Sequence, residues 1–167
     1  MKDIKVFSYC LGGWFIFGTL ILYALISFFD FLIGMEGRVM QEQGFSFMYR
    51  MMNEMFKYCL PLIFFGIGYI AMGYYYEKIR KNALMIHIAL SAGLFIWGLI
   101  AAIKIYPAIS GLADMIPDHN DDFMETYNKT VISGSAIMGV VQFVFPQFYL
   151  GYLINKNNKE AADEEPT

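Results

Sequence analysis

Four long stretches of the chain carry no Asp, Glu, Lys or Arg, namely residues 6–29, 58–76, 82–103 and 130–155. Each is close to the ~20 apolar residues that a helix needs to cross the hydrocarbon core of a bilayer. A solvated helix carries charge on its wet side. Inside lipid an unpaired charge is costly, and backbone polar groups must bond within the helix. The pattern therefore predicts an all-α membrane protein with four transmembrane helices in a compact bundle.

One further segment, residues 45–57, has an amphipathic pattern. Placed at 100° per residue, its apolar side chains fall on one arc and its polar side chains on the opposite arc. The apolar arc holds Phe45, Met48, Met51, Met52, Met55 and Phe56, and the polar arc holds Ser46, Arg50, Asn53, Glu54 and Lys57. This pattern predicts a short amphipathic helix that lies in the membrane interface on the outer side or caps the bundle.

The connection between the second and third charge-free stretches is short and basic. Residues 74–76 are three tyrosines, and residues 77–81 (EKIRK) follow them. Aromatic residues followed by a basic turn are typical of a helix end at a membrane surface, and so short a connection predicts an antiparallel hairpin. Pro61 is expected in the first turn of the second helix, where its missing N–H costs nothing. Pro107 is expected to end the third helix.

The chain has 167 residues, of which 57% are hydrophobic and 18% aromatic, so four spans use most of its length. Residues 1–155 are expected to form one transmembrane domain, and no room remains for a separate soluble domain. Residues 156–167 are polar and acidic, and we expect them to form a disordered tail.

The distribution of Lys and Arg predicts the orientation of the chain. With the N-terminus in the cytoplasm, the inner segments hold Lys2, Lys5, Lys78, Arg80, Lys81, Lys156 and Lys159. The two longer outer loops hold Arg38, Arg50, Lys57, Lys104 and Lys129, diluted among acidic residues. Because positive charge per residue is higher in the first set, both termini are expected to be cytoplasmic. The short chain and its basic inner turns fit a bacterial inner membrane.

His87 is the one histidine within a predicted span. A bis-His haem held between spans needs a second intramembrane histidine, which the sequence does not supply, so this cofactor is excluded within one protomer. No other cofactor is predicted. Intramembrane polar groups find internal partners. Matching depths across the spans gives Tyr69, Gln147 and Tyr149 as the expected partners of His87.

The fourth stretch is the most polar, and Ser135, Gly139, Gln142 and Pro146 line one face of its predicted helix. Pro146 has no N–H to donate, so the carbonyl of Gln142 loses its helical partner near the bilayer midplane. A packed helix interface explains this face, with small residues allowing close approach and Gln142 bonding to a neighbouring helix. Transporters use such broken helices to coordinate substrates or ions, so a transport pathway is the alternative.

Two outer segments contain residue types that bind metals. Met48, Met51, Met52 and Met55 could present thioethers to a soft ion such as Cu(I), although the same spacing suits an apolar helix face. The second outer loop offers the oxygen ligands that Ca²⁺ prefers, but without EF-hand spacing, and a solvated acidic loop is the expected interpretation. Its polar residues are Asp114, Asp118, His119, Asn120, Asp121, Asp122 and Glu125.

The spans contain no Asp, Glu, Lys or Arg, no Ser/His/Asp set, no HExxH pair and no Gly-rich phosphate loop. Catalysis is therefore not expected, and no nucleic-acid partner is predicted. The leading hypothesis is a non-catalytic subunit, assembly factor or scaffold of a larger membrane complex, formed by copies of this chain or with other membrane subunits. Small-residue faces for such helix contacts are expected at Gly66 with Gly73 and at Gly98 with Ala102.

Two other functional hypotheses remain open at this stage. A small transporter or channel-forming oligomer would use the break at Gln142 and Pro146. A copper-handling protein on the outer face would use the methionines of residues 48–55. The lipid bilayer is an expected partner under all three hypotheses.

Overall fold

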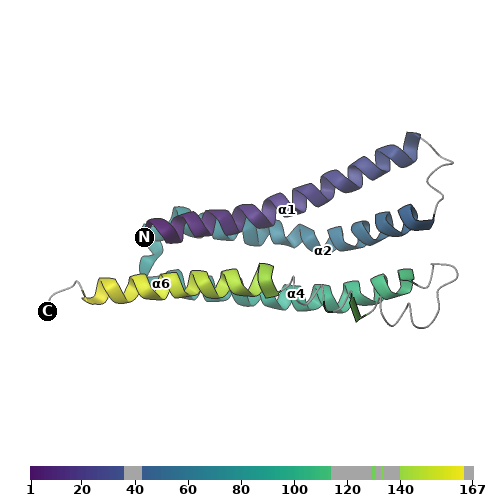
Figure 1. Ribbon diagram of the computed structural model, residues 1–167. Coiled ribbons are helices and arrows are strands. Elements are labelled where there is room, and N and C mark those ends of the chain that lie inside the picture. Colours follow the sequence, from purple (N-terminus) through teal and green to yellow (C-terminus); the bar gives the residue numbers. More distant parts are fainter. Residues whose placement is uncertain (36–42, 114–128, 131–132, 134–139, 164–167) are drawn as a thin grey trace.

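The computed structural model describes residues 1–35, 43–113, 129–130, 133 and 140–163. This part of the chain is helical and contains no strand. Its elements are α1 (Lys2–Met35), α2 (Gln43–Tyr74), α3 (Tyr76–Ile79), η2 (Arg80–Asn82), α4 (Ala83–Ala113), η3 (Val140–Val144) and α6 (Phe145–Asp163). Figure 1 shows the long helices side by side, with the start of α1, the α3–η2 turn and the end of α6 at one end. The all-helical fold expected from the sequence is confirmed for these residues.

Within the residues that the structure describes, three segments are long and apolar enough to cross a membrane. They are Lys2–Leu32 in α1, Met52–Tyr74 in α2, and Tyr76–Ile105, which runs from α3 into α4. Helices α1, α2 and α4 have 34, 32 and 31 residues. At ~1.5 Å per residue, each is longer than the ~30 Å hydrocarbon core. The predicted fourth span, 130–155, is described without interruption only from Val140 onward, as η3 and the first half of α6.

Helices α1 and α2 pack antiparallel along most of their length (Figure 1). In the half of the pair nearest the N-terminus, a Cβ atom built on Gly12 would lie 2.5 Å from the carbonyl oxygen of Gly66, so the two backbones are nearly in contact. At the far end, Tyr49 Oη donates a 2.6 Å hydrogen bond to Asp30 Oδ1. This bond raises the pKa of the Tyr49 phenol, because the neutral hydroxyl is the form that donates to the carboxylate.

Helix α4 returns antiparallel to α2. Near the α3–η2 turn, Tyr69 Oη lies 3.2 Å from Ser91 Oγ. Farther from the turn, Trp97 Nε1 donates a 2.9 Å hydrogen bond to the carbonyl of Tyr58. Since residues earlier in α2 contact residues later in α4, these pairs confirm the antiparallel hairpin expected from the short basic connection.

Helix α6 packs against α1 and α4 and runs parallel to α2. The rings of Phe15 and Phe143 stack with centroids 5.7 Å apart, and Phe7 meets Tyr149 edge to face at 5.0 Å. The buried hydrophobic core is made by α1, α2, α3, α4 and α6. It contains Ile4, Leu11, Phe15, Tyr69, Met72, Tyr76, Ala83, Leu94, Leu150 and Ile154. The core therefore spans the half of the molecule nearest the termini.

The amphipathic segment 45–57 is helical, but it is not a separate interfacial helix. It forms the first half of α2, which continues without interruption to Tyr74. Pro61 accordingly lies deep inside a helix, so the prediction that it occupies a first turn is wrong. The prediction failed because Lys57 ends the charge-free run, whereas the helical period of the apolar residues continues through it.

Two neighbouring helices donate hydrogen bonds to the turn that precedes Pro61. A proline ring removes one helical bond and displaces the carbonyl groups before it. Thr19 Oγ1 from α1 donates to the Cys59 carbonyl at 3.2 Å, and Trp97 Nε1 from α4 donates to the Tyr58 carbonyl at 2.9 Å. Neither acceptor is the Lys57 carbonyl that Pro61 leaves without a helical donor, so the two bonds support the turn before the proline and do not replace the missing bond.

The ends of α4 and α6 also differ from expectation. Helix α4 continues through Pro107 to Ala113, so the prediction that Pro107 ends the third helix is wrong. The missing N–H affects a single helical bond, and the rest of the helix stays intact around it. Helix α6 continues to Asp163, so residues 156–163 of the predicted tail are helical, while residues 164–167 lie outside the described part.

Candidate functional site

Four polar side chains from three helices meet inside the bundle. Tyr69 comes from α2, His87 and Ser91 come from α4, and Gln147 comes from α6. Tyr69 is fully buried, and His87 is 4% exposed. We call these four residues the polar junction. A buried polar group in a membrane protein must find an internal hydrogen-bond partner, so these four side chains have to bond to one another or to the backbone.

The side-chain amide of Gln147 is the centre of the polar junction. Its Oε1 accepts hydrogen bonds from Tyr69 Oη and from Ser91 Oγ, the latter at 3.0 Å. The two hydroxyl oxygens also lie 3.2 Å from each other. One amide oxygen thereby joins α2, α4 and α6.

His87 bonds to the backbone of α6 rather than to a side chain. Its Nε2 lies 2.9 Å from the carbonyl oxygen of Gln147. A carbonyl can only accept, so Nε2 carries the hydrogen of this bond. Ser91 Oγ lies 3.5 Å from the same nitrogen. Because Nε2 is already a donor, His87 cannot accept the hydroxyl proton of Ser91, and the pair lacks the geometry of a nucleophile with its general base.

A glycine on α6 makes room for the imidazole. A Cβ atom built on Gly151 would lie 3.2 Å from His87 Nε2 and 3.4 Å from His87 Cδ2. Gly151 follows Gln147 by one helical turn, so it lies beside the carbonyl that His87 contacts. The absence of a side chain at this position lets the ring reach the backbone of α6.

Two buried atoms of the polar junction have no hydrogen-bond partner among the described residues, His87 Nδ1 and Gln147 Nε2. The neutral ring that donates through Nε2 has an acceptor at Nδ1, and the amide nitrogen is a donor. Leaving such a group unpaired costs about 1–3 kcal/mol. The polar junction therefore holds the helices together with only some of its polar atoms. Its acceptor His87 Nδ1 and its donor Gln147 Nε2 take no part in these hydrogen bonds.

Of the three hydrogen-bond partners expected for His87, only Gln147 is confirmed, because the Tyr69 hydroxyl bonds to Ser91 and Gln147 instead. Gln147 bonds to His87, and the Tyr69 ring lies 6.1 Å from the imidazole between centroids. The prediction for Tyr149 is wrong, since its ring packs on Phe7 and is 52% exposed. Ser91 was missed. It follows His87 by four residues on the same helix face, which was the signal available in the sequence.

The break predicted in the fourth span coincides with an irregular helical turn. Residues Val140–Val144 form the π-helical turn η3, and α6 begins with Phe145 and Pro146. A π-turn widens the helix by one residue and is enriched at functional sites. Gln142 lies within this turn, four residues before Pro146, and its side chain is outside the described part. Ser135 and Gly139 also lie outside it.

The methionine stripe is described only in part. Met52 is buried, and with Tyr49 and Phe56 it forms the side of α2 that faces α1. Met55 is half-buried, whereas the side chains of Met48 and Met51 lie outside the described residues. The role visible for Met52 is therefore helix packing. The acidic loop residues 114–125 also lie outside the described part.

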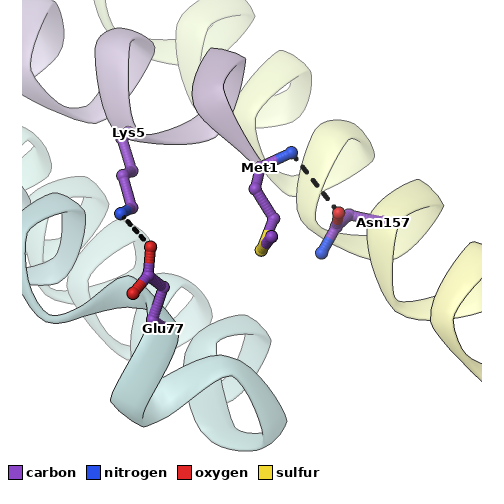
Figure 2. Close-up of polar contacts among 4 residues, drawn as sticks. All are labelled: Met1, Lys5, Glu77 and Asn157. Carbon is purple, nitrogen blue, oxygen red and sulfur yellow. Dashed lines mark hydrogen bonds and ion pairs between the residues drawn. The ribbon is translucent and has the colours of Figure 1, made fainter.

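A second polar group ties the helix ends together near the termini. Asn157 on α6 donates through Nδ2 to Tyr76 Oη at 3.0 Å, and its carbonyl accepts from Arg80 Nη2 at 3.3 Å. Its Oδ1 also accepts from the N-terminal amine of Met1 at 3.5 Å (Figure 2). Asn157 thus joins α6 to the N-terminal residue, to α3 and to η2 at the end of the bundle beyond the polar junction.

The arrangement holds helices together at two levels, through Gln147 in the polar junction and through Asn157 near the N-terminus. Comparison of the chain with protein-family models, curated proteins and solved structures found no match. What the site does must therefore be argued from its own residues.

Proposed function

We propose that this protein is a four-span membrane protein that acts as a non-catalytic subunit, assembly factor or scaffold, through contacts of its helices with other copies or other membrane proteins. The observation that carries the proposal is the use of its interior polar groups. The amide oxygen of Gln147 accepts hydrogen bonds from Tyr69 and Ser91, and His87 donates to the α6 backbone. These groups stabilise the helix arrangement rather than aligning reacting atoms.

The outer surface of the helices supports the same function. Only 11–17% of the residues in the three apolar windows are buried inside the protomer. On α4, Gly98 has no neighbouring atom within 4 Å of a built Cβ, and both Gly98 and Ala102 are exposed. This small-residue face, expected to pack, has no partner among the described residues of its own chain. A helix from another subunit could approach it closely.

The orientation proposed with this function follows the Lys and Arg distribution. The start of α1, the α3–η2 turn and the end of α6 lie at one end of the molecule (Figure 1), and seven of the twelve Lys and Arg residues belong to these segments. The positive-inside rule then gives cytoplasmic termini, as in a bacterial inner-membrane protein.

The test is the state of the full-length protein when it is gently extracted and purified in detergent. We expect a defined homo-oligomer or stoichiometric co-purified membrane subunits by native mass spectrometry. The variant Gly98→Leu with Ala102→Leu should lose this association while keeping its helical content, since leucine would hold a partner helix away. Gly18→Leu is the matched control, because Gly18 is also exposed with no atom within 4 Å of its built Cβ. A monomer in the unaltered protein would contradict the proposal.

A small transporter is the second candidate, and the π-turn η3 is the observation that favours it. Together with Pro146, this turn interrupts the regular hydrogen bonding of the fourth predicted span around Gln142, as in the broken helices of transporters. The Gln142→Leu variant separates the two functions. Loss of flux in reconstituted vesicles with unchanged assembly would favour transport, whereas loosened assembly would favour the scaffold.

A further inference from the structure

One end of the molecule carries seven of the twelve Lys and Arg residues. We call it the basic end, and it comprises the start of α1, the α3–η2 turn and the last part of α6 (Figure 1). Its cations are Lys2, Lys5, Lys78, Arg80, Lys81, Lys156 and Lys159. Three of them, Lys78, Arg80 and Lys81, lie in the four consecutive residues 78–81 of the α3–η2 turn, so their charges are confined to a small surface.

Two acidic residues at this end, Glu77 and Glu160, are paired with lysines of α1 and α6 rather than with the cations of the turn. Glu77 turns toward α1, where its Oε1 lies 2.6 Å from Lys5 Nζ (Figure 2). Glu160 pairs with Lys156 on α6 at 3.8 Å. Within the described residues, Lys78, Arg80 and Lys81 form no ion pair. Their positive charge is therefore available to an external anion.

Arg80 is held in place without losing its binding capacity. One guanidinium N–H donates to the Asn157 carbonyl at 3.3 Å, and Asn157 is itself anchored by Tyr76 and the Met1 amine. A guanidinium has five N–H donors in a planar fork that suits phosphate oxygens. The contact with α6 orients the group and leaves most of the fork free.

The surroundings of the turn are those of a membrane interface. Tyr74 is 70% exposed and Tyr75 is 48% exposed. The Lys78 ammonium lies 5.8 Å from the centroid of the Tyr75 ring. Amphipathic aromatic rings beside cations are characteristic of the headgroup level of a bilayer.

An apolar surface continues from the turn along α4. Met85 and Ile88 follow Lys81 by four and seven residues, which is one and two helical turns. They are 71% and 57% exposed. Lys81, just before α4, is thus followed by the exposed apolar side chains of Met85 and Ile88, a surface of the kind that acyl chains contact.

We propose that the α3–η2 turn binds the phosphate of an anionic phospholipid headgroup. Arg80 and Lys81 contact the phosphate oxygens, Lys78 adds attraction, and the acyl chains lie on the α4 face of Met85 and Ile88. Free phosphate offers the same charge, but the apolar face below the cations favours a lipid. The predicted cytoplasmic position of this end matches the leaflet whose surface is negative.

The experiment measures lipid binding to the full-length protein in zwitterionic detergent by native mass spectrometry. Phosphatidylglycerol and phosphatidylcholine with identical acyl chains are added in equal amounts. We expect a preference for phosphatidylglycerol that falls roughly five-fold for each cation removed, hence roughly twenty-five-fold in the double variant Lys78→Gln with Lys81→Gln. Removal of two cations outside the basic end, Lys57→Gln with Lys104→Gln, should leave the preference unchanged.

Three results would overturn the proposal. They are equal binding of the two lipids, an undiminished preference in the Lys78/Lys81 double variant, and an equal loss in the Lys57/Lys104 control. If inorganic phosphate in tenfold excess over lipid abolishes the preference, the site recognises phosphate and the lipid assignment is wrong. The variant Arg80→Lys keeps the charge and the fold but loses the fork, so its preference should fall by a few-fold.

Discussion

The α1–α2 contact and the polar junction hold helices together by opposite means. In the first, two glycines let backbones meet, and a Cβ built on either Gly12 or Gly66 would lie under 3 Å from the other's carbonyl oxygen. In the second, the side chains of Tyr69, Ser91 and Gln147 share hydrogen bonds across three helices. Close approach gains dispersion energy and depends on the absence of atoms, whereas the junction depends on the presence of specific polar atoms.

This difference determines how each contact fails. Adding atoms at the glycine contact forces backbones apart along the whole antiparallel pair, because a backbone cannot yield as a flexible side chain does. Removing atoms at the polar junction loses only the net stabilisation of one or two hydrogen bonds. In membranes this stabilisation is on average well below the free-energy cost of a steric clash between backbones. Substitutions at the two contacts should therefore differ in how much stability they cost and in how far the structural change extends from the substituted residue.

The largest effect is expected for Gly66→Leu. Its side chain would meet the Gly12 carbonyl and Ile16, each within 2.7 Å of the built Cβ. We expect a loss of about 3 kcal/mol in the free energy of unfolding, at the upper end of overpacking costs. The control Gly13→Leu lies next to Gly12 but has no atom within 4 Å of its built Cβ, so its stability should hardly change. Reversible unfolding in mixed micelles measures both, and similar losses for the two variants would refute steric control.

A smaller effect is expected at the centre of the polar junction. Gln147→Leu deprives the hydroxyls of Tyr69 and Ser91 of their shared acceptor, and also removes the unpaired Nε2. The two changes oppose each other, so we expect a net loss of about 1–2 kcal/mol.

A double-mutant cycle sharpens this expectation. Once Gln147→Leu has removed the acceptor, Tyr69→Phe should cost less than it does in the unaltered protein, because the hydroxyl has already lost its strongest partner. Thermal unfolding of the four proteins in detergent measures the coupling. Strict additivity would show that Tyr69 and Gln147 do not act as a unit.

The sequence alone predicts these two contacts to different degrees. Gly66 and Gly73 are recognisable as a packing face by their spacing, and Gly66 and Gly73 do lie against α1. Depth matching places Gln147 opposite His87 because charge-free runs fix where each helix crosses the bilayer. It fails for Tyr149, since depth says nothing about which way a side chain points around the helix axis.

The prolines show the other limit of sequence-based prediction. Pro61 and Pro107 were expected near helix ends because a proline removes a backbone donor. Both lie inside helices, and donors from α1 and α4 bond to the turn that precedes Pro61. Such support from neighbouring helices leaves no local signal in the sequence. The same holds for the merging of residues 45–57 into α2, because Lys57 marks a polar position and not a helix end.

The smallest effect is expected at the two donors that bond to the turn before Pro61. Trp97→Phe keeps an aromatic ring against Tyr58 but removes the N–H that donates to its carbonyl at 2.9 Å. Thr19→Val keeps the shape of the side chain and removes a hydroxyl that already serves Phe15 in its own helix at 2.9 Å. Each change should cost about 0.6 kcal/mol in global stability, the average for such bonds in membranes. The local effect should be clearer. In the variants, amide hydrogen exchange around Pro61 should become faster than in the unaltered protein, and this increase should be larger than the increase around Gly66. Unchanged exchange near Pro61 in the double variant would mean that the turn is stable without donors from its neighbours, and that sequence rules for proline fail here for another reason.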